Sequence, residues 1–475
     1  MIRPTRLGLA IALAASALPA HAADPTTREL LARIAALEQR LAAVEAANAA
    51  PAAPAAAVAP DELEQRLRLV ERRQELEAEA DAGKAASTPV LALNEKGLSV
   101  KSAAGDFEVK LRGLVQGDGR YFGGDASSAQ TDSFLLRRVE PTLEGSWGKL
   151  IGFRINAQLA GDSATINDAY IDLKVDPHAT VRAGKFKPPV GLERLQSSNA
   201  TASIELGLPS ELAPGRDIGV QLSGEFAGGG LGYALGLFNG AADGRDGLAS
   251  NPDGDFEVAA RVFAEPWKNS ANALSGLGFG IAASRGDKHG NGNNVLPRYR
   301  TPGQVPFFNY RGTVLADGEH LRIAPQAYYY GGRLGLLGEY IRSQQELRTA
   351  AGARAELDNS AWQVSAGWVL TGEDASYKGV LKPSNAFSLD GDGWGAFEVV
   401  GRYGRLDIDD AAFPLFADPA VASAAARSWG IGLNWYFNAN FKLVANYART
   451  AFDAAPGATA RDDEEIVSTR AQFSF

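Results

Sequence analysis

Arginine and lysine side chains recur at alternate positions of strand-like segments, and this spacing indicates chemistry done by fixed charges. Lys110 and Arg112 share one segment, and Arg154 and Lys174 hold equivalent places in later ones. Alternate residues of an extended strand face the same side. A face lined by guanidinium and ammonium groups raises the local concentration of small anions and repels cations. The spacing therefore predicts a charged face in contact with water.

The residues of common enzyme active sites are absent or scattered. The chain has no cysteine, and its four histidines are His21, His178, His289 and His320. We find no His-x-x-x-His pair, nucleophile elbow or phosphate loop. Aspartate pairs such as Asp253 with Asp255 could bind calcium weakly, but acidic turns explain them better. We expect no enzyme activity, no cofactor and no metal site.

The segments that carry the basic side chains have the period-two alternation of β-strands. About sixteen such runs follow one another from about residue 99 onward. They centre near residues 111, 140, 155, 171, 182, 221, 235, 259, 280, 326, 338, 364, 400, 432, 446 and 470. One face is apolar and aromatic, and the other carries Arg, Lys and Asn. This pattern predicts an all-β transmembrane barrel of about sixteen antiparallel strands around a water-filled lumen.

Both ends of the chain fit a barrel in the bacterial outer membrane. The last segment alternates apolar and polar residues and ends on Phe475, an aromatic suited to the membrane interface. At the other end, Arg3 and Arg6 precede an apolar run at residues 7–18 and an Ala-x-Ala cleavage site that ends at Ala22. Residues 1–22 are therefore predicted to be a signal peptide. We expect an exported protein that contacts outer-membrane lipid and lipopolysaccharide.

Three segments are expected between the signal peptide and a barrel that spans residues 97–475. Residues 23–48 carry apolar side chains at heptad spacing and predict a short coiled coil. Residues 49–60 form an Ala/Pro linker, and residues 61–96 a second helical segment and linker. The helices are either solvated and amphipathic or a periplasmic oligomerisation stalk that contacts the cell wall. The net charge of −9 argues against nucleic-acid binding but leaves ion selectivity open, because a pore responds to its lining charges.

One long connection, residues 186–216, differs from the others. It contains Pro188, Pro189, Pro209 and Pro214, which exclude a regular strand, together with several leucines that could anchor it. Long loops inside a compact fold are usually functional or disordered, and this one lacks the composition of disorder. We predict a constriction loop folded into the lumen; the alternative is an ordinary external loop.

Several motifs in one order resemble the phosphate-selective porin O and P family. They lie at residues 134–140, 166–171, 183–193, 214–222, 296–303 and 433–437. The similarity extends over about residues 97–475. It implies a homotrimer of sixteen-stranded, anion-selective channels with arginines and lysines along the route, often preceded by a short coiled coil.

The resemblance assigns the arginine pair at the narrow part of the pore to Arg137 and Arg138. Strict strand alternation would point only one of them inward, so both can act only at a bulge or a rim position. Their alternative role is to reach the membrane interface from the strand end. Lys185 and Lys187 flank the entrance of the long loop, and Arg194 and Arg216 lie within it or at its exit.

Three further positions extend the predicted site. Asp168 matches an acidic position near the family's constriction, where it would hold an arginine in place or form a simple salt bridge. Arg298 and Arg300 lie in an external-loop motif and form either the upper part of a basic track or plain surface charge.

The chain departs from the family pattern at Asn199. Phosphate-binding members carry a lysine just after a Ser-Ser pair in the constriction loop, whereas Ser197 and Ser198 are followed here by Asn199. No lysine occurs from residue 188 to residue 221. An asparagine offers neutral dipoles where a lysine offers a compact charge. The departure puts phosphate specificity in question and leaves a general preference for anions to the arginines.

These observations predict an outer-membrane porin for passive diffusion of small anions, with phosphate or polyphosphate as candidate solutes. Two alternatives remain. One is a general porin of weak selectivity, which the missing lysine favours. The other is a structural protein that tethers the membrane to the cell wall through its coiled coil.

Overall fold

The computed structural model describes residues 60–123, 131–292, 295–379 and 382–475, together with Ala35, Gln39 and Ala42. The predicted signal peptide, coiled coil and Ala/Pro linker lie outside these residues, apart from the three isolated helical positions and Pro60, so they stay predictions. The chain divides into two compact units, Met1–Gly83 and Lys84–Phe475, each of which is described by itself.

A single helix, α2 (Pro60–Ser87), fills most of the described part before the barrel. Ion pairs one turn apart, such as Arg68 with Glu64 and Arg73 with Glu77, stabilise it locally. Its apolar side chains Leu67 and Val70 are more than half exposed. The predicted second helix is thus present, while its packing against a partner helix remains a prediction. Among the described residues, no helix combines the length and apolar character needed to span a membrane.

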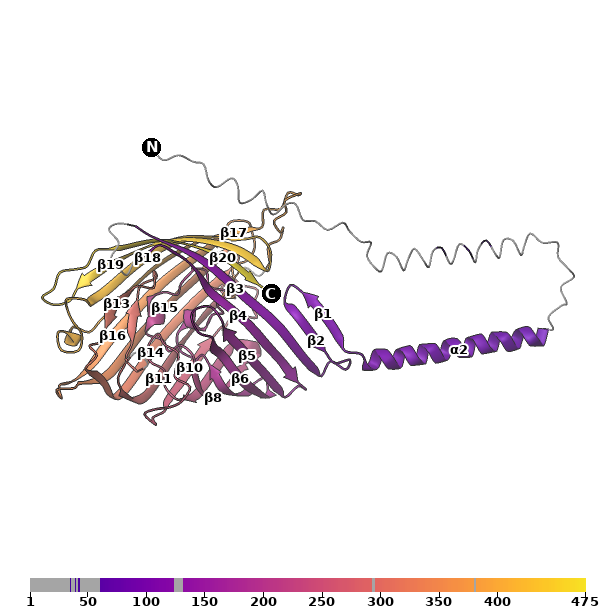
Figure 1. Cartoon of the computed structure of the whole chain (residues 1–475), viewed down its shortest axis with the longest axis horizontal. Helices are drawn as coiled ribbons and strands as arrows, with labels where there is room; N and C mark the ends of the chain where they lie inside the picture. Colours follow the sequence, from indigo (N-terminus) through magenta and orange to yellow (C-terminus); the bar gives the residue numbers. More distant parts are fainter. Residues whose placement is uncertain are drawn as a thin grey trace. The chain divides into compact units, whose positions relative to one another are not determined.

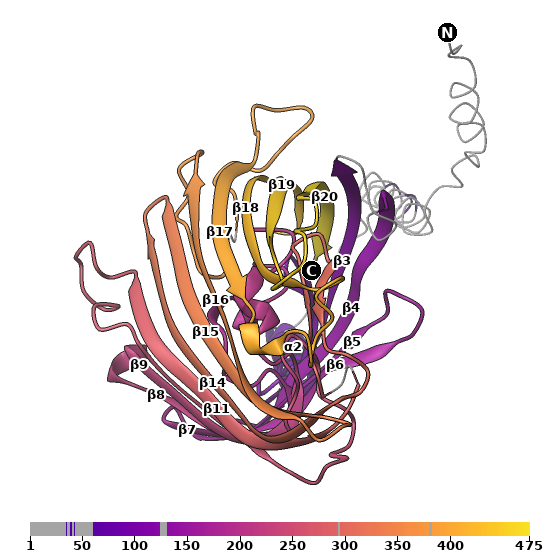
Figure 2. The same cartoon turned by 90° about the vertical axis from the view of Figure 1, so that its left-hand side faces the viewer.

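Sixteen antiparallel strands form a closed barrel (Figures 1 and 2). Each strand pairs with the next, and the last pairs with the first from Glu465 opposite Gly123 to Ser474 opposite Leu114. The strands are β3 (Phe107–Gly123), β4 (Ser133–Trp147), β5 (Ile151–Gln158), β6 (Thr165–Asp176), β7 (Ala179–Phe186), β8 (Asp217–Phe226), β9 (Leu231–Phe238), β10 (Glu257–Ala264), β11 (Leu277–Gly290), β14 (Val314–Gly331), β15 (Leu334–Thr349), β16 (Arg354–Val369), β17 (Ala396–Asp407), β18 (Ser423–Tyr436), β19 (Phe441–Ala454) and β20 (Glu464–Ser474).

The period-two alternation accounts for these strands. In β20, Ser468 and Arg470 are buried on the inside, while Val467 and Phe473 are exposed on the outside. Every predicted strand centre falls within one of the sixteen strands, so the predicted barrel is confirmed.

Aromatic rings lie on the outer wall of the barrel. Phe107 and Trp147 lie 4.6 Å apart between centroids at the rim where β3 begins. Trp429 and Tyr447 lie 5.4 Å apart near the middle of β18 and β19. An aromatic ring at a rim suits the interface of a bilayer, where it contacts both lipid and water.

The two ends of the barrel carry different connections. The end where β3 begins and β20 finishes, here called the turn end, has short connections such as residues 332–333 and 437–440. The opposite, loop end carries long ones. One long connection, residues 370–395 between β16 and β17, also lies at the turn end.

A hairpin precedes the barrel where a linker was expected. Strands β1 (Val90–Asn94) and β2 (Gly97–Lys101) pair with each other. Strand β2 also pairs, antiparallel, with the first part of β3, where Leu98 lies opposite Leu111. The turn between them is local: the Asn94 side chain accepts from the Lys96 backbone N–H at 2.9 Å, and Gly97 adopts a φ of 96°. The alternating apolar residues of this stretch can therefore pair in register.

The inside of the barrel holds a packed apolar core built from connections. Residues 187–216, here called the inner loop, contribute Val190, Leu208 and Leu212. Strands β12 (Arg298–Arg300) and β13 (Pro306–Asn309) form a small sheet in the connection between β11 and β14, which adds Phe307 and Phe308. Folding these segments inward buries their leucines and aromatics, which an extended external loop would expose. The core narrows the lumen and fixes the inner loop within it.

Candidate functional site in the lumen

The inner loop starts at β7 and reaches the inner faces of strands far along the chain. Its backbone carbonyls accept from Gln116 (to Ser198, 3.1 Å), Asn434 (to Ala202, 2.9 Å) and Arg470 (to Ile204, 2.9 Å). These donors belong to β3, β18 and β20. The loop therefore lies inside the barrel, held by polar side chains of the opposite wall.

The connection at residues 370–395 meets the inner loop from the turn end. The Tyr377 hydroxyl donates to the Leu192 carbonyl at 2.5 Å, and Gln196 Nε2 donates to the Tyr377 carbonyl at 2.6 Å. The Tyr377 ring also stacks on Tyr328 of β14 with 5.0 Å between centroids. The sequence analysis did not predict this contact between residues 370–395 and the inner loop. The feature that could have indicated it is the long gap between the predicted strand centres at residues 364 and 400.

A solvent-open hollow of about 1720 Å³ lies between the inner loop and strands β4 to β10. Its wall carries six basic and four acidic side chains. The basic ones are Arg154, Lys174, Arg182, Lys187, Arg216 and Arg261, and the acidic ones are Glu140, Asp168, Asp172 and Glu225. The wall therefore has an excess of positive charge, although the chain as a whole is acidic.

Asp168 holds two of these arginines. Its Oδ1 accepts from Arg216 Nε at 2.8 Å, and its Oδ2 lies 3.4 Å from Arg154 Nε. Arg154 also pairs with Glu144 at 2.8 Å. A carboxylate between two guanidinium groups fixes their positions and leaves part of their charge for the lumen.

Arg182 is held in a similar way on the neighbouring strand. Its Nε and Nη2 donate to the two carboxylate oxygens of Asp172 at 2.7 and 2.9 Å, and its guanidinium lies 3.8 Å from the centroid of Tyr170. Arg182 and Arg261 were not among the predicted site residues. The sequence feature that could have identified them is the alternation that places basic residues on the polar face of the strands.

Lys187 is buried just inside the inner loop. Its ammonium donates to the carbonyls of Arg194 and Gln196, each at 2.7 Å. Burial, together with the nearby Arg216 and Arg194 guanidinium groups, lowers the pKa of Lys187 to about 7. The charge of this lysine is therefore present below neutral pH and lost above it.

This titration predicts a pH-dependent selectivity. We expect the ratio of anion to cation permeability to fall by up to about 16-fold as pH rises through about 7, because losing one positive charge changes the anion and cation concentrations by up to about fourfold each, in opposite directions. Reversal potentials of single channels at several pH values measure the ratio. The Lys187→Met variant should show the lower ratio at every pH; an unchanged pH dependence in that variant would contradict the assignment.

Arg137 and Arg138 both turn inward because the β3–β4 pairing contains a bulge. Gln116 pairs with Arg138 and Gly117 with Leu136, so Arg137 is the extra residue. Arg138 Nη1 donates to Gln116 Oε1 at 2.7 Å. Arg137 instead forms an ion pair with Glu205 of the inner loop, with Nε 2.6 Å from Oε1. Its charge is neutralised within the protein.

The remaining predicted residues lie in different places. Lys185 does not line the hollow: Arg182 and Phe186 face the lumen, and strand alternation turns Lys185 to the outer wall. Arg194 donates to the Ser210 carbonyl and closes the inner loop on itself. The Asn199 side chain is exposed, while its carbonyl accepts from Gln472 Nε2 at 3.1 Å.

Arg298 and Arg300 lie in β12, and the Arg300 backbone N–H donates to Glu211 Oε2 at 3.0 Å. The small β12–β13 sheet that carries them packs on the inner loop rather than outside the barrel. Within the described residues, no group of three or more potential metal ligands is found.

The comparisons with known proteins agree with this architecture. A family model described as phosphate-selective porin O and P matches residues 107–475. Porin O of Pseudomonas aeruginosa is 23% identical over 417 residues, which covers 80% of this chain and 91% of that protein. The outer membrane channel DcaP of Acinetobacter baumannii superimposes with a TM-score of 0.50 at 14% identity, covering 79% of this chain and 99% of that one, and so shares the fold.

An anion-selective porin from Comamonas acidovorans gives a TM-score of 0.49 at 14% identity, over 78% of this chain and all of that one. The family match spans most of the chain, including all sixteen barrel strands. The protein is therefore a porin of the bacterial outer membrane and belongs to the phosphate-selective porin O and P family.

Proposed function

We propose that the protein is a channel, and not an enzyme, through which small anions diffuse passively across the outer membrane. The excess of positive charge on the wall of the hollow, where the inner loop narrows the lumen, carries this proposal. We also propose that it assembles as a homotrimer among outer-membrane lipid and lipopolysaccharide, as the family resemblance implies.

Selectivity in this proposal arises from charges fixed in a narrow, wet passage. A unit charge about 5 Å from an ion changes its energy by about 0.8 kcal/mol even at the dielectric constant of water, which is about a fourfold change in concentration. Arg216 and Arg154 are positioned by Asp168 and need no rearrangement to act on a passing ion. Anions are concentrated at this point and cations are repelled.

The preferred solute depends on which positively charged side chains the inner loop places at the hollow. Ser197 and Ser198 line the hollow, and the exposed Asn199 that follows them supplies neutral dipoles only. Lys187 supplies an ammonium nearby, but two carbonyls already hold it. We propose a channel that passes small anions generally, phosphate among them, and binds phosphate weakly. The description of its family as phosphate-selective makes phosphate, with polyphosphate, the first solute to test.

The test is the single-channel reversal potential in a potassium chloride gradient, followed by titration with phosphate. We expect anion selectivity with weak block by phosphate. Asn199→Lys should strengthen the block, because it adds an ammonium beside the serine pair. Near-equal permeabilities would favour the general porin, and cation selectivity would contradict the proposal.

A further inference from the structure

Glu205 lies in the second half of the inner loop, among arginines of the barrel wall. Arg137 approaches its carboxylate as a fork, with Nε 2.6 Å from Oε1 and Nη2 3.0 Å from Oε2. Arg120 Nη2 donates to Oε1 at 2.8 Å, and Arg470 Nη2 lies 3.9 Å away. The Glu205 side chain is only 7% exposed. This is the geometry in which arginines hold a carboxylate or a phosphate.

The neighbouring acidic side chains form ion pairs with other arginines. Asp118 accepts two hydrogen bonds from Arg470, each 2.7 Å long. Glu193 pairs with Arg402. Among the described residues, Glu205 is the only carboxylate within ion-pair distance of Arg120 and Arg137. Without it, these two guanidinium groups would have no carboxylate in direct contact, although Asp118 and Glu140 still act on Arg137 from a greater distance.

Glu205 is ionised at neutral pH in spite of its position. Burial by itself would raise the pKa of Glu205, but the guanidinium groups of Arg137, Arg138 and Arg470 together outweigh burial and hold the pKa well below its usual range. The carboxylate therefore acts as a permanent negative charge within the arginine cluster.

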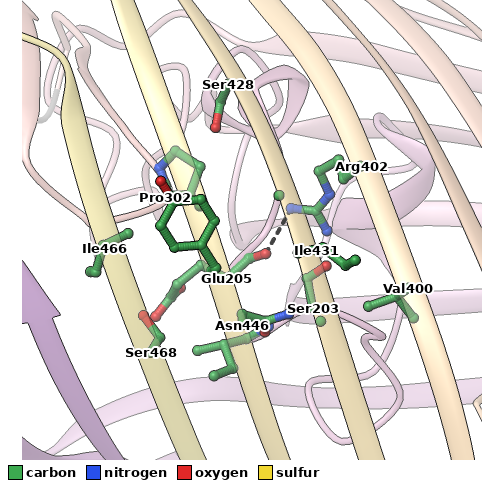
Figure 3. A pocket seen from close by; sticks show the side chains of 15 residues that line it. Ser203, Glu205, Pro302, Val400, Arg402, Ser428, Ile431, Asn446, Ile466 and Ser468 are labelled. Carbon is green, nitrogen blue, oxygen red and sulfur yellow. Dashed lines mark hydrogen bonds between the residues drawn. The ribbon is translucent and has the colours of Figure 1, made fainter. Parts of the chain in front are cut away.

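A hollow of about 500 Å³, partly open to solvent and lined by polar and apolar residues, reaches Glu205 from one side. Figure 3 shows Ser203, Asn446 and Ser468 around it, with Arg402 hydrogen-bonded to Glu205. That bond joins Arg402 Nη1 to the Glu205 backbone carbonyl at 2.9 Å. Arg137 is itself 27% exposed. The cluster is therefore not sealed from solvent, although Glu205 already occupies it.

We propose that Arg120 and Arg137 form an oxyanion site whose built-in ligand is Glu205. The native carboxylate excludes solute carboxylates and phosphate from this site, because a tethered group competes at a high effective concentration. A channel needs sites from which ions can leave, and two free buried arginines would retain an anion. Glu205 thus limits how tightly the pore binds the anions it passes. This inference rests on the proposed anion channel.

The first test replaces Glu205 by glutamine, which keeps the shape and removes the charge. We expect succinate and phosphate to block E205Q at concentrations about tenfold lower than they block the native channel, because each gains charge-assisted hydrogen bonds to Arg120 and Arg137. Stronger block by succinate identifies a carboxylate site, and stronger block by phosphate a phosphate site. The double variant E205Q/R137Q should return to the native sensitivity.

Glu225→Gln is the matched control. Glu225 lines the large hollow and pairs with no arginine among the described residues, so its loss changes the lumen charge without freeing a guanidinium pair. E225Q should raise anion selectivity and strengthen block by at most about fourfold, the effect of one wall charge on the local anion concentration, which is less than the tenfold expected for E205Q. Equal block in E205Q and E225Q would overturn the proposal.

A second test does not depend on ion flow. E205A leaves a space beside the arginines that acetate or phosphate can fill. We expect added acetate or phosphate to raise the thermal unfolding temperature of detergent-solubilised E205A but not of the native protein or of E205A/R137Q. No rescue by either anion would overturn the site even if the channel is anion-selective. Rescue in a channel that proves cation-selective would keep the site and reject the proposed function.

Discussion

Replacing Arg322 by methionine is expected to destabilise the folded barrel by about 3–5 kcal/mol, the range measured when one partner of a buried ion pair is removed. The Arg322 side chain is fully buried. It lies 2.6 Å from Asp243 and 2.7 Å from Glu257, and it also donates to the Ala241 carbonyl at 2.8 Å. Methionine fills similar volume but leaves two carboxylates without this cation.

The loss of stability should be concentrated at the loop end of the barrel. Asp243 and Ala241 belong to the connection between β9 and β10, whereas Arg322 belongs to β14, so the ion pair fastens that connection to the wall. The temperature at which the detergent-solubilised protein loses its compact, fast-migrating form on gels measures the effect, together with circular dichroism.

Arg342→Met is the matched control. Arg342 pairs with Asp358 on the outer face of the neighbouring strand, and both side chains are more than a third exposed. Exposed pairs contribute about 0–1 kcal/mol, so this variant should unfold close to the native temperature. Equal destabilisation by the two substitutions would show that burial of the Arg322 network is not what stabilises the barrel.

Replacing Arg216 by glutamine is expected to lower the ratio of anion to cation permeability by about 16-fold, because one unit charge about 5 Å from the ion path changes the concentrations of anions and of cations about fourfold each, in opposite directions. The variant removes a positive charge from the wall of the hollow and takes from Asp168 its closest partner. The Asp168 carboxylate, without its closest partner, then attracts cations, and this lowers the permeability ratio further. Single-channel reversal potentials measure the change.

Arg285→Gln provides the control for Arg216. Arg285 pairs with Glu319 on the outer wall, and its side chain is 70% exposed. The same chemical change there should leave selectivity unaltered, because bulk water and salt screen that charge from the lumen. A similar shift in both variants would mean that the net charge of the protein, and not the wall of the hollow, sets selectivity.

The barrel was predictable because its strands follow a strictly local rule. Each strand must alternate apolar and polar residues to face lipid and water, so β5 and β20 can be recognised without knowing their neighbours. The same rule also indicated a problem at Arg137 and Arg138, which a bulge resolves. The β1–β2 hairpin was missed because its short strands lie within a stretch that reads as a linker.

The contacts inside the lumen were not predictable in the same way. The partners of Glu205 and Arg322 lie tens to hundreds of residues away in the sequence, and no spacing rule relates a loop carboxylate to the wall that it meets. Family resemblance placed Arg137 in the pore but could not reveal that a glutamate of the same chain neutralises it. The contact between Tyr377 and the inner loop depends likewise on two connections folding toward each other.

The position of Glu205 has a consequence for the assembly of the protein. Arg120 and Arg137 belong to the first hairpin of the barrel and Arg470 to its last strand, so the carboxylate spans the seam along which β20 closes on β3. The cluster is complete only after that seam has closed, and contacts so distant in sequence form late in folding. A barrel in which β20 has not yet paired with β3 would therefore lack the Arg470 contacts that help to hold the inner loop.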